Sequence, residues 1–238
     1  MKNLLSPDNT KIVIRILDLF CGAGGAAEGY RQALEVLGIK YEIVGVDIAK
    51  QPRYPFTFVQ GDALEYLALH GSEFDFIHAS PPCQQYSACK NIPQNRTNTY
   101  PDLVVPVREA LIRTGVPYVI ENVVSAPLHT NIILCGTMFG LKVYRHRAFE
   151  SSLMLFQPAH FKHTERIGGY RPGGKLPRKA PRDWEGYICV AGGNFTIAQA
   201  RRAMGIDWMT KKEIAEAIPP AYTRWIGMQI FSTVERVK

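Results

Sequence analysis

A cysteine on a stiffened loop is the side chain in this sequence best placed for chemistry. Cys83 stands in the stretch SPPCQQYS, residues 80–87, where two prolines restrict the backbone just before the thiol and polar residues follow it. A cysteine that only fills a core needs no such setting. A thiol near a helix start and basic side chains can have a lowered pKa and act as a nucleophile. The stretch therefore predicts that Cys83 is a nucleophile.

Two further motifs place charged side chains where they could assist a nucleophile. Glu121 and Asn122 end the apolar stretch YVIENV, and a carboxylate there is costly unless it is paired or used in chemistry. Arg145 and Arg147 alternate in YRHRAFE, so a short strand would point both in the same direction. If these stretches are strands of one sheet, we expect Glu121, Asn122, Arg145 and Arg147 near the same edge of that sheet as Cys83.

A glycine-rich turn and two aspartates predict a nucleoside site. The turn DLFCGAGG, residues 18–25, follows an apolar stretch and opens a helix, so its backbone can approach a ligand closely. Asp47 ends VGVD, where a carboxylate can accept both ribose hydroxyls, and Asp62 in QGDALEY could bond an adenine amino group. No Walker lysine follows the glycines, which favours a nucleoside without phosphate, commonly S-adenosyl-L-methionine. The alternative is that both aspartates are helix N-caps.

Alternating strands and helices must position these residues. Apolar, β-branched stretches predict strands at 11–19, 41–46, 56–60, 74–79, 117–120, 131–135 and 144–149. Helical patterns cover 26–37, 63–70, 103–113, 197–204, 211–217 and a last stretch from 219 towards 231. Such alternation predicts an α/β fold whose mostly parallel sheet is covered on both faces. The carboxyl ends of its strands would bring the motifs to one edge.

Composition and net charge indicate the cellular location of the protein and the kind of partner that it binds. The chain has 238 residues, a net charge of +7 and five scattered cysteines. An odd, scattered set of cysteines indicates reduced thiols and a cytoplasmic location, and the positive charge favours a polyanionic partner. The apolar runs are too short to span a bilayer, and the first residues lack the pattern of a signal peptide. We expect a monomer with no membrane contact.

The cysteines and histidines do not predict a metal site. Cys89, Cys135 and Cys189 have no histidine or cysteine at metal-ligand spacing, and no second pair accompanies His160 and His163. The sequence therefore predicts no metal.

The character of the chain changes between residues 151 and 194. This segment is rich in glycine, proline and basic residues and shows no clear period. It is either a surface insertion or a small lobe that contacts the partner, since long irregular segments are commonly functional. We expect residues 1–150 to form the catalytic and cofactor-binding core, 151–194 the lobe, and 195–238 helices that complete the core.

The ordered motifs resemble those of the cytosine-C5 DNA methyltransferase family. DLFCGAGG, VGVD, GDA, SPPCQ, IENV and RHR follow one another in the family's order, and TIAQARRAMGI and AIPPAYTRWIGMQI resemble its last two blocks. The resemblance implies a Rossmann-like S-adenosylmethionine-dependent methyltransferase fold with a small irregular recognition lobe. Two positions depart from the family: Val143 replaces a usual glutamine, and Glu216 replaces a usual asparagine near the end.

The resemblance also implies roles for individual residues. Cys83 would add to carbon 6 of a flipped cytosine, Glu121 would contact N3 and the exocyclic amine, Arg147 would hold O2, and Arg145 would orient the pair. The cofactor would contact Phe20, Gly22, Gly24, Asp47, Ile48, Asp62, Ala63 and Pro82. Double-stranded DNA would contact Gln84, Ser87, Lys90 and Arg96 in a mobile loop and Arg171, Lys175, Arg178 and Lys179 in the lobe.

Three alternatives stay open at this level. A branch of the same family methylates tRNA cytosine with the same catalytic residues. A relative could bind DNA without catalysis, although such a protein would not need Cys83, Glu121 and Arg147. An altered cofactor pocket could also transfer a group other than methyl.

Overall fold

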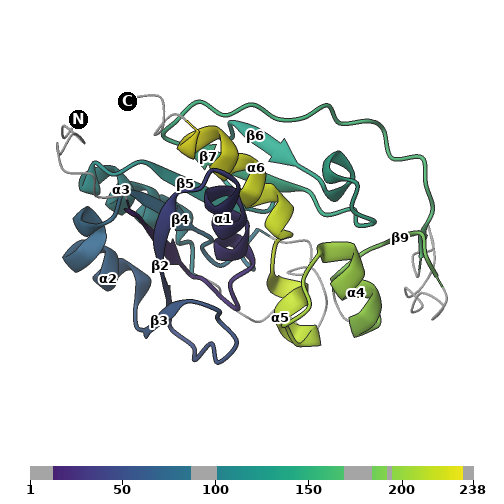
Figure 1. The fold of residues 1–238 in the computed structure, drawn as a ribbon, viewed down its shortest axis with the longest axis horizontal. Helices are drawn as coiled ribbons and strands as arrows, with labels where there is room; N and C mark the ends of the chain where they lie inside the picture. Colours follow the sequence, from purple (N-terminus) through teal and green to yellow (C-terminus); the bar gives the residue numbers. More distant parts are fainter. Residues whose placement is uncertain (1–12, 87–100, 169–183, 192–194, 233–238) are drawn as a thin grey trace.

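A seven-stranded sheet organises the structure, a computed structural model that describes residues 13–86, 101–168, 184–191 and 195–232 (Figure 1). The strand order is β3-β2-β1-β4-β5-β7-β6. The strands are β1 Val13–Leu19, β2 Lys40–Asp47, β3 Thr57–Gln60, β4 Phe76–Ala79, β5 Tyr118–Asn122, β6 Ile132–Leu134 and β7 Arg147–Ser151. The first five are parallel, and β7 runs antiparallel to both β5 and β6. The predicted mostly parallel α/β sheet is therefore confirmed.

Two apolar layers cover the sheet, one on each face. Helices α1 (Gly25–Val36) and α6 (Pro220–Phe231) share a buried cluster with one set of strand residues. Helices α2 (Ala63–His70) and α3 (Val104–Thr114) share another cluster with the alternate set. Central strands buried on both faces read as continuous apolar runs, which is why the sequence pattern located them.

Helices α1 and α6 pack unusually closely, side by side in Figure 1. A Cβ atom at Gly29 would collide with Thr223 and with the backbone carbonyl of Pro220. The Thr223 hydroxyl donates a hydrogen bond of 2.8 Å to the Ala26 carbonyl. This contact anchors the end of the chain to the helix that begins at the glycine turn.

A third apolar cluster lies beside the sheet and includes α4 (Ile197–Met204) and α5 (Lys211–Glu216). Two short parallel strands, β8 (Ile167–Gly168) and β9 (Tyr187–Ile188), lie near it. The short 3-10 helices η1 (Gly71–Glu73) and η4 (Gly136–Phe139) complete the regular elements of the described ranges. Among the residues that the structure describes, no helix has the length and apolarity needed to cross a membrane.

Most predicted elements agree with the structure to within a few residues. The predicted helix at 63–70 coincides with α2, because Asp62 caps its first turn. The strand predicted at 144–149 is wrong at its start, since β7 begins at Arg147. Arg145 therefore lies before the strand. Between β7 and β8 the chain runs without helices or strands along the outside of the structure (Figure 1).

Candidate active site

The glycine turn after β1 adopts a backbone that few side chains tolerate. Gly22 and Gly24 have φ angles of 48° and 85°, and Phe20 between β1 and the turn has a φ of 57°. A Cβ atom at Gly24 would lie 2.7 Å from the Pro55 side chain. The N-cap residue of α1 is Gly24, which has no side chain to cap the first turn. A non-glycine residue in the left-handed region is the kind of strain that collects at functional sites.

Asp47 ends β2 and holds the turn in place. Its Oδ2 accepts a hydrogen bond of 3.0 Å from the Gly22 N–H, and its Oδ1 accepts one of 2.9 Å from the Ala49 N–H. The neighbouring Ile48 side chain is 71% exposed, a large apolar surface beside a carboxylate. The two residues therefore offer a polar and an apolar contact at one end of the turn.

Asp62 has the alternative role that the sequence left open. It is the N-cap of α2, and its Oδ1 accepts hydrogen bonds from the backbone N–H groups of Leu64 and Glu65 at 2.8 and 3.0 Å. The side chain is exposed, and Ala63 beside it is buried. Capping uses one carboxylate oxygen and does not prevent a ligand from using the other.

Cys83 lies on a loop held by one hydrogen bond from β5 and by one within the loop. Asn122 at the end of β5 donates a hydrogen bond of 2.8 Å to the Pro81 carbonyl, and the Tyr86 N–H donates one of 3.0 Å to the Cys83 carbonyl. Cys83 and Pro82 are half-buried. Because β4 and β5 are parallel neighbours, this loop follows β4 at the edge where Glu121 ends β5.

The expected lowering of the Cys83 pKa is wrong for this structure. Burial raises the pKa of the thiol from its ordinary value, and the charge of Glu121 raises it further. The positive charges of Arg147 and Arg145 oppose this increase. The sequence showed the loop and the basic residues but gave no measure of how deeply the thiol is buried.

Glu121 and Arg147 form a close ion pair beside Cys83. The distance from Arg147 Nε to Glu121 Oε1 is 2.9 Å, and both side chains are largely buried. Burial raises the pKa of Glu121, while the charges of Arg147 and Arg145 and a hydrogen bond with Ser80 act to lower it. Because β7 is antiparallel, its first residue, Arg147, meets the carboxyl end of β5.

A buried chain of hydrogen bonds continues from Glu121 into the core. His78 lies between the Tyr30 hydroxyl, 2.9 Å from its Nδ1, and Ser80 Oγ, 2.9 Å from its Nε2. Burial lowers the pKa of His78 to about 3, so the ring is neutral at physiological pH. The sequence gave no sign that Ser80 and Tyr30 are the partners of His78, because these contacts depend on the fold.

Arg145 has partners of its own beside the Glu121–Arg147 pair. It is buried and donates hydrogen bonds to two backbone carbonyls, those of Val190 at 2.6 Å and Ala215 at 2.9 Å. Burial and the charge of Arg147 lower the pKa of Arg145 to about 9. Within the described residues its Nε atom has no hydrogen-bond partner. Arg145 thus joins three segments around the site, and its charge still reaches Cys83 and Glu121.

The two residues that depart from the family pattern, Val143 and Glu216, lie in different environments. Val143 is fully buried in the third apolar cluster and forms an isolated bridge with Ile188, a place suited to an apolar side chain. Glu216 is exposed at the end of α5, directly after the residue whose carbonyl receives Arg145.

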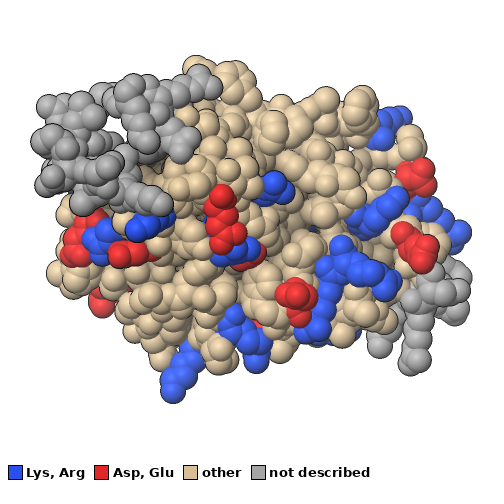
Figure 2. All heavy atoms as spheres, viewed as in Figure 1, with Lys and Arg blue, Asp and Glu red and all other residues tan. Residues whose placement is uncertain are grey.

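Most predicted nucleic-acid contacts lie outside the described residues. Gln84 is exposed next to Cys83. Ser87, Lys90, Arg96, Arg171, Lys175, Arg178 and Lys179 fall in the ranges that the structure does not describe. Lys and Arg side chains also gather over α4 and β9 in Figure 2. Arg201 and Arg202 of the last turn of α4 are both exposed there.

Comparison with solved structures identifies the class of fold. The S. pombe Dnmt2 methyltransferase is similar with a TM-score of 0.58 and 14% identity, covering 94% of this chain and 99% of that chain. The Entamoeba histolytica methyltransferase EhMeth is similar with a TM-score of 0.58 and 13% identity, over the same shares. No family model and no curated protein matches the sequence. The chain therefore has the Rossmann-like fold of these methyltransferases, which confirms the predicted fold class.

Proposed function

We propose that this protein is a cytosine-C5 methyltransferase that acts on double-stranded DNA with S-adenosyl-L-methionine as its cofactor. The observation that carries the proposal is the meeting of the Cys83 thiol with the Glu121–Arg147 ion pair at the carboxyl edge of the sheet. A nucleophile, a carboxyl group of raised pKa and a guanidinium are the three groups that alkylation at carbon 5 of cytosine requires. The fold shared with two methyltransferases supports the same interpretation.

The chemistry assigns one task to each group. Carbon 5 of cytosine is a weak nucleophile, and addition of the Cys83 thiolate to carbon 6 makes it electron-rich. Glu121, whose pKa burial raises, shares a proton with N3 as negative charge develops on the ring. Arg147 donates hydrogen bonds to O2. After carbon 5 is alkylated, it loses its proton and Cys83 leaves carbon 6, which restores the aromatic ring and the thiolate. The target base must leave the helical stack to reach these groups.

The residues of the glycine turn fit the proposed cofactor. The start of α1 has no side-chain cap, and Gly22 and Gly24 allow a ligand close to the backbone. Asp47 would bind the ribose hydroxyls, and Ile48 would cover a face of the adenine. When bound, S-adenosyl-L-methionine supplies an electrophilic methyl group. Asp47 also fixes the turn itself, so it would act both on the ligand and on the shape of its site.

Electrostatics supports a nucleic acid as the substrate. The chain has a net charge of +7, and a basic protein attracts the phosphate backbone. Exposed Gln84 follows the nucleophile directly, where it could approach a strand from which a base has been extruded. The catalytic motifs are common to DNA and tRNA methyltransferases of this family, so parallel assays on duplex DNA and tRNA decide between the proposed substrate and its alternative.

Trapping with 5-fluorocytosine tests the nucleophile and the substrate together. Fluorine on carbon 5 cannot leave as a proton does, so the reaction stops after methyl transfer with Cys83 still bonded to carbon 6. The probe is a long duplex in which 5-fluorocytosine replaces every cytosine, so that the experiment does not require knowledge of the target sequence. We expect an adduct that resists denaturation and forms only when S-adenosyl-L-methionine is present. A transcribed tRNA that contains 5-fluorocytidine is the parallel substrate.

Two cysteine variants make the assignment specific. Cys83→Ser should form no adduct, because a hydroxyl needs a much stronger base than a thiol to become an anion. Cys189→Ser is the matched control, because Cys189 is an exposed thiol outside the Cys83 loop. If only the Cys189 variant lost the adduct, the nucleophile would be Cys189 and not Cys83. If an adduct formed on tRNA but not on DNA, the proposed DNA substrate would be wrong and the proposed covalent mechanism would still hold.

A further inference from the structure

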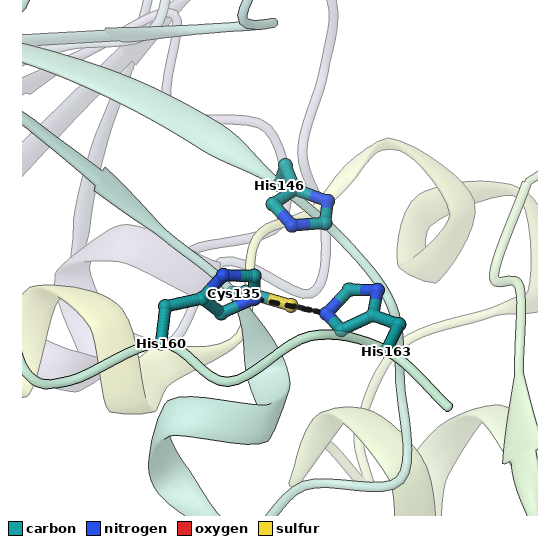
Figure 3. Close-up of side chains that lie close together, drawn as sticks. All are labelled: Cys135, His146, His160 and His163. Atoms are coloured by element: carbon teal, nitrogen blue, oxygen red, sulfur yellow. Dashed lines mark hydrogen bonds between the residues drawn. The ribbon is translucent and has the colours of Figure 1, made fainter. Parts of the chain in front are cut away.

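Four potential metal ligands meet outside the candidate active site. They are Cys135, His146, His160 and His163, and one ligand atom from each lies within 4.8 Å of all the others. Figure 3 shows the thiol and the three imidazole rings gathered around a common point. Spacing along the sequence gave no sign of this group, because its four ligands come from three segments of the chain.

The sheet itself brings the first two ligands together. Strands β6 and β7 pair antiparallel, with Leu134 opposite Arg147. The next residue on one side is Cys135 and the preceding residue on the other is His146, so they face each other just beyond the ladder. Opposed residues in antiparallel strands have Cβ atoms about 5 Å apart, a separation that one metal ion can bridge.

The other two ligands come from the irregular segment after β7. Its path is fixed by hydrogen bonds from the Ile133 N–H to Gln157 Oε1, 3.0 Å, and from the Tyr144 hydroxyl to the Glu165 carbonyl, 3.2 Å. The His163 ring stacks on Tyr144 with centroids 3.9 Å apart and an angle of 8° between the planes. The segment therefore presents His160 and His163 to Cys135 in a defined orientation.

The distances within the cluster suit a common cation. The Nε2 atoms of His160 and His163 are 2.9 Å apart, and Cys135 Sγ is 3.4 Å from His163 Nε2. In a tetrahedral zinc site, bond lengths of about 2.0 Å to nitrogen and 2.3 Å to sulfur place neighbouring ligand atoms roughly 3.3–3.6 Å apart. The Thr137 hydroxyl donates to Cys135 Sγ at 3.4 Å, as expected of an outer partner that supports a thiolate ligand.

We propose that Cys135, His146, His160 and His163 bind a zinc ion in a closed, structural site. Four protein ligands complete a tetrahedral shell and leave no position for substrate, which distinguishes a structural from a catalytic zinc. Imidazole and thiolate are the ligands that zinc prefers over calcium or magnesium. The ion would join the β6–β7 edge to a segment that has no regular structure of its own.

The location gives the ion a consequence for the active site. His146 stands between Arg145 and Arg147, and successive side chains of an extended chain point in opposite directions. The zinc would hold the backbone between the two arginines from the side opposite to the Glu121 ion pair. It would thereby position Arg147 without touching the substrate.

Metal analysis of the untagged protein tests the site directly. After incubation with zinc and removal of unbound metal, elemental mass spectrometry should find about one zinc ion per chain, the stoichiometry of a single closed site. His160→Ala should lose this zinc, and its exposed ring makes misfolding of the variant a small concern. His129→Ala is the matched control, since His129 is exposed and is not one of the four ligands. Full zinc content in His160→Ala would overturn the proposal.

Cobalt substitution and thermal unfolding provide independent readouts. Cobalt(II) in place of zinc should give the strong visible absorption of a tetrahedral site and a thiolate charge-transfer band, and Cys135→Ser should lose that band. Zinc should raise the melting temperature of the wild type and of His129→Ala but not of His160→Ala. A wild-type protein that retains no zinc, or a cobalt spectrum without a thiolate band, would also overturn the proposal. None of these measurements requires methyltransferase activity.

Discussion

Burial sets the charge of several side chains around Cys83. It raises the pKa values of Cys83 and Glu121 and lowers that of Arg145 to about 9. Burial thus disfavours ionisation of the Cys83 thiol and the Glu121 carboxyl group, whereas the neighbouring Arg145 and Arg147 favour ionisation of both. In the proposed reaction, a bound base that changes the local charge would shift this balance towards the Cys83 thiolate.

His78 provides a test of this burial through pH. An unfolded histidine takes up a proton below pH about 6.5, whereas the folded ring stays neutral down to about 3. Between these values the unfolded state binds more protons, so the free energy of unfolding should fall as the pH falls through this window. Above the window, His78 should make no contribution to the pH dependence of stability. We expect His78 to contribute a slope of up to about 1.4 kcal/mol per pH unit.

Urea unfolding of wild type and His78→Asn at several pH values between 7 and 4.5 measures this contribution. The variant will be less stable at neutral pH, because it loses its partners Tyr30 and Ser80. Its stability should nevertheless decline less steeply with acid than that of the wild type. Equal slopes would show that His78 is charged, or accessible to protons, in the folded protein.

At the scale of elements, one buried ion pair joins α3 to β7. Arg108 Nε and Nη2 lie 2.7 and 2.6 Å from the two carboxylate oxygens of Glu150, and both residues are at least 90% buried. Glu150 also accepts a hydrogen bond from the His129 N–H, and Arg108 donates one to the Pro127 carbonyl. The pair thus connects the helix, the strand and the loop that enters β6.

Breaking this pair on one side should cost much more than removing both charges. Arg108→Met leaves Glu150 buried without its partner and should lower the free energy of unfolding by about 3–5 kcal/mol. Arg108→Met/Glu150→Met removes both charges and should recover part of that loss. Chemical denaturation of the two single variants and the double variant gives the coupling energy.

A less buried set of ion pairs, within one helix, is the comparison for this experiment. Arg31 contacts Glu28 and Glu35 on the surface of α1, at 2.6 and 2.5 Å. Arg31→Met should cost no more than about 1 kcal/mol, since ion pairs spaced three or four residues apart on one helix contribute little. A similar cost for Arg108→Met and Arg31→Met would contradict the view that burial makes the first pair structural.

The sequence predicted the elements better than their contacts. Local patterns determine where α2 begins and where the apolar strands lie, so those predictions succeeded. The partners of Arg145 could not be predicted, because its hydrogen bonds to the Val190 and Ala215 carbonyls depend on the tertiary fold. The cluster around Cys135 was missed for the same reason: the register of β6 against β7 creates it, and spacing along the chain contains no sign of that register.

At the scale of the whole molecule, the fold places the candidate site and one group of cations on the same side. The carboxyl ends of β1 and β2 carry the glycine turn and Asp47, and α5 is tied to the loop after β2 by the ion pair between Arg53 and Glu213, 2.7 Å. The Trp208 indole N–H, just before α5, donates a hydrogen bond of 2.8 Å to the Ala23 carbonyl of the turn. Cations on α4 and α5 therefore lie towards the edge of the sheet that carries Cys83.

This arrangement predicts which cations contribute to DNA binding. Arg202 on α4 and Lys212 on α5 are exposed, and each phosphate that they neutralise should release counterions. The logarithm of the binding constant should fall linearly with the logarithm of the salt concentration. In Arg202→Gln/Lys212→Gln the slope should flatten by about 0.9 for each phosphate that the variant no longer neutralises. Fluorescence anisotropy with one labelled duplex over a range of salt concentrations measures both slopes.

The opposite edge of the sheet supplies a charge-matched control. Lys40 begins β2 and Arg113 lies in the last turn of α3, just before β5, so both belong to the amino edge, away from Cys83. Lys40→Gln/Arg113→Gln removes the same net charge and should leave the slope close to that of the wild type, because counterion release depends on direct phosphate binding rather than on total charge. If both double variants flattened the slope equally, DNA would respond to the overall charge of the molecule. If only the Lys40/Arg113 variant flattened it, DNA would bind at the amino edge, and the site built around Cys83 could not receive its substrate in the proposed way.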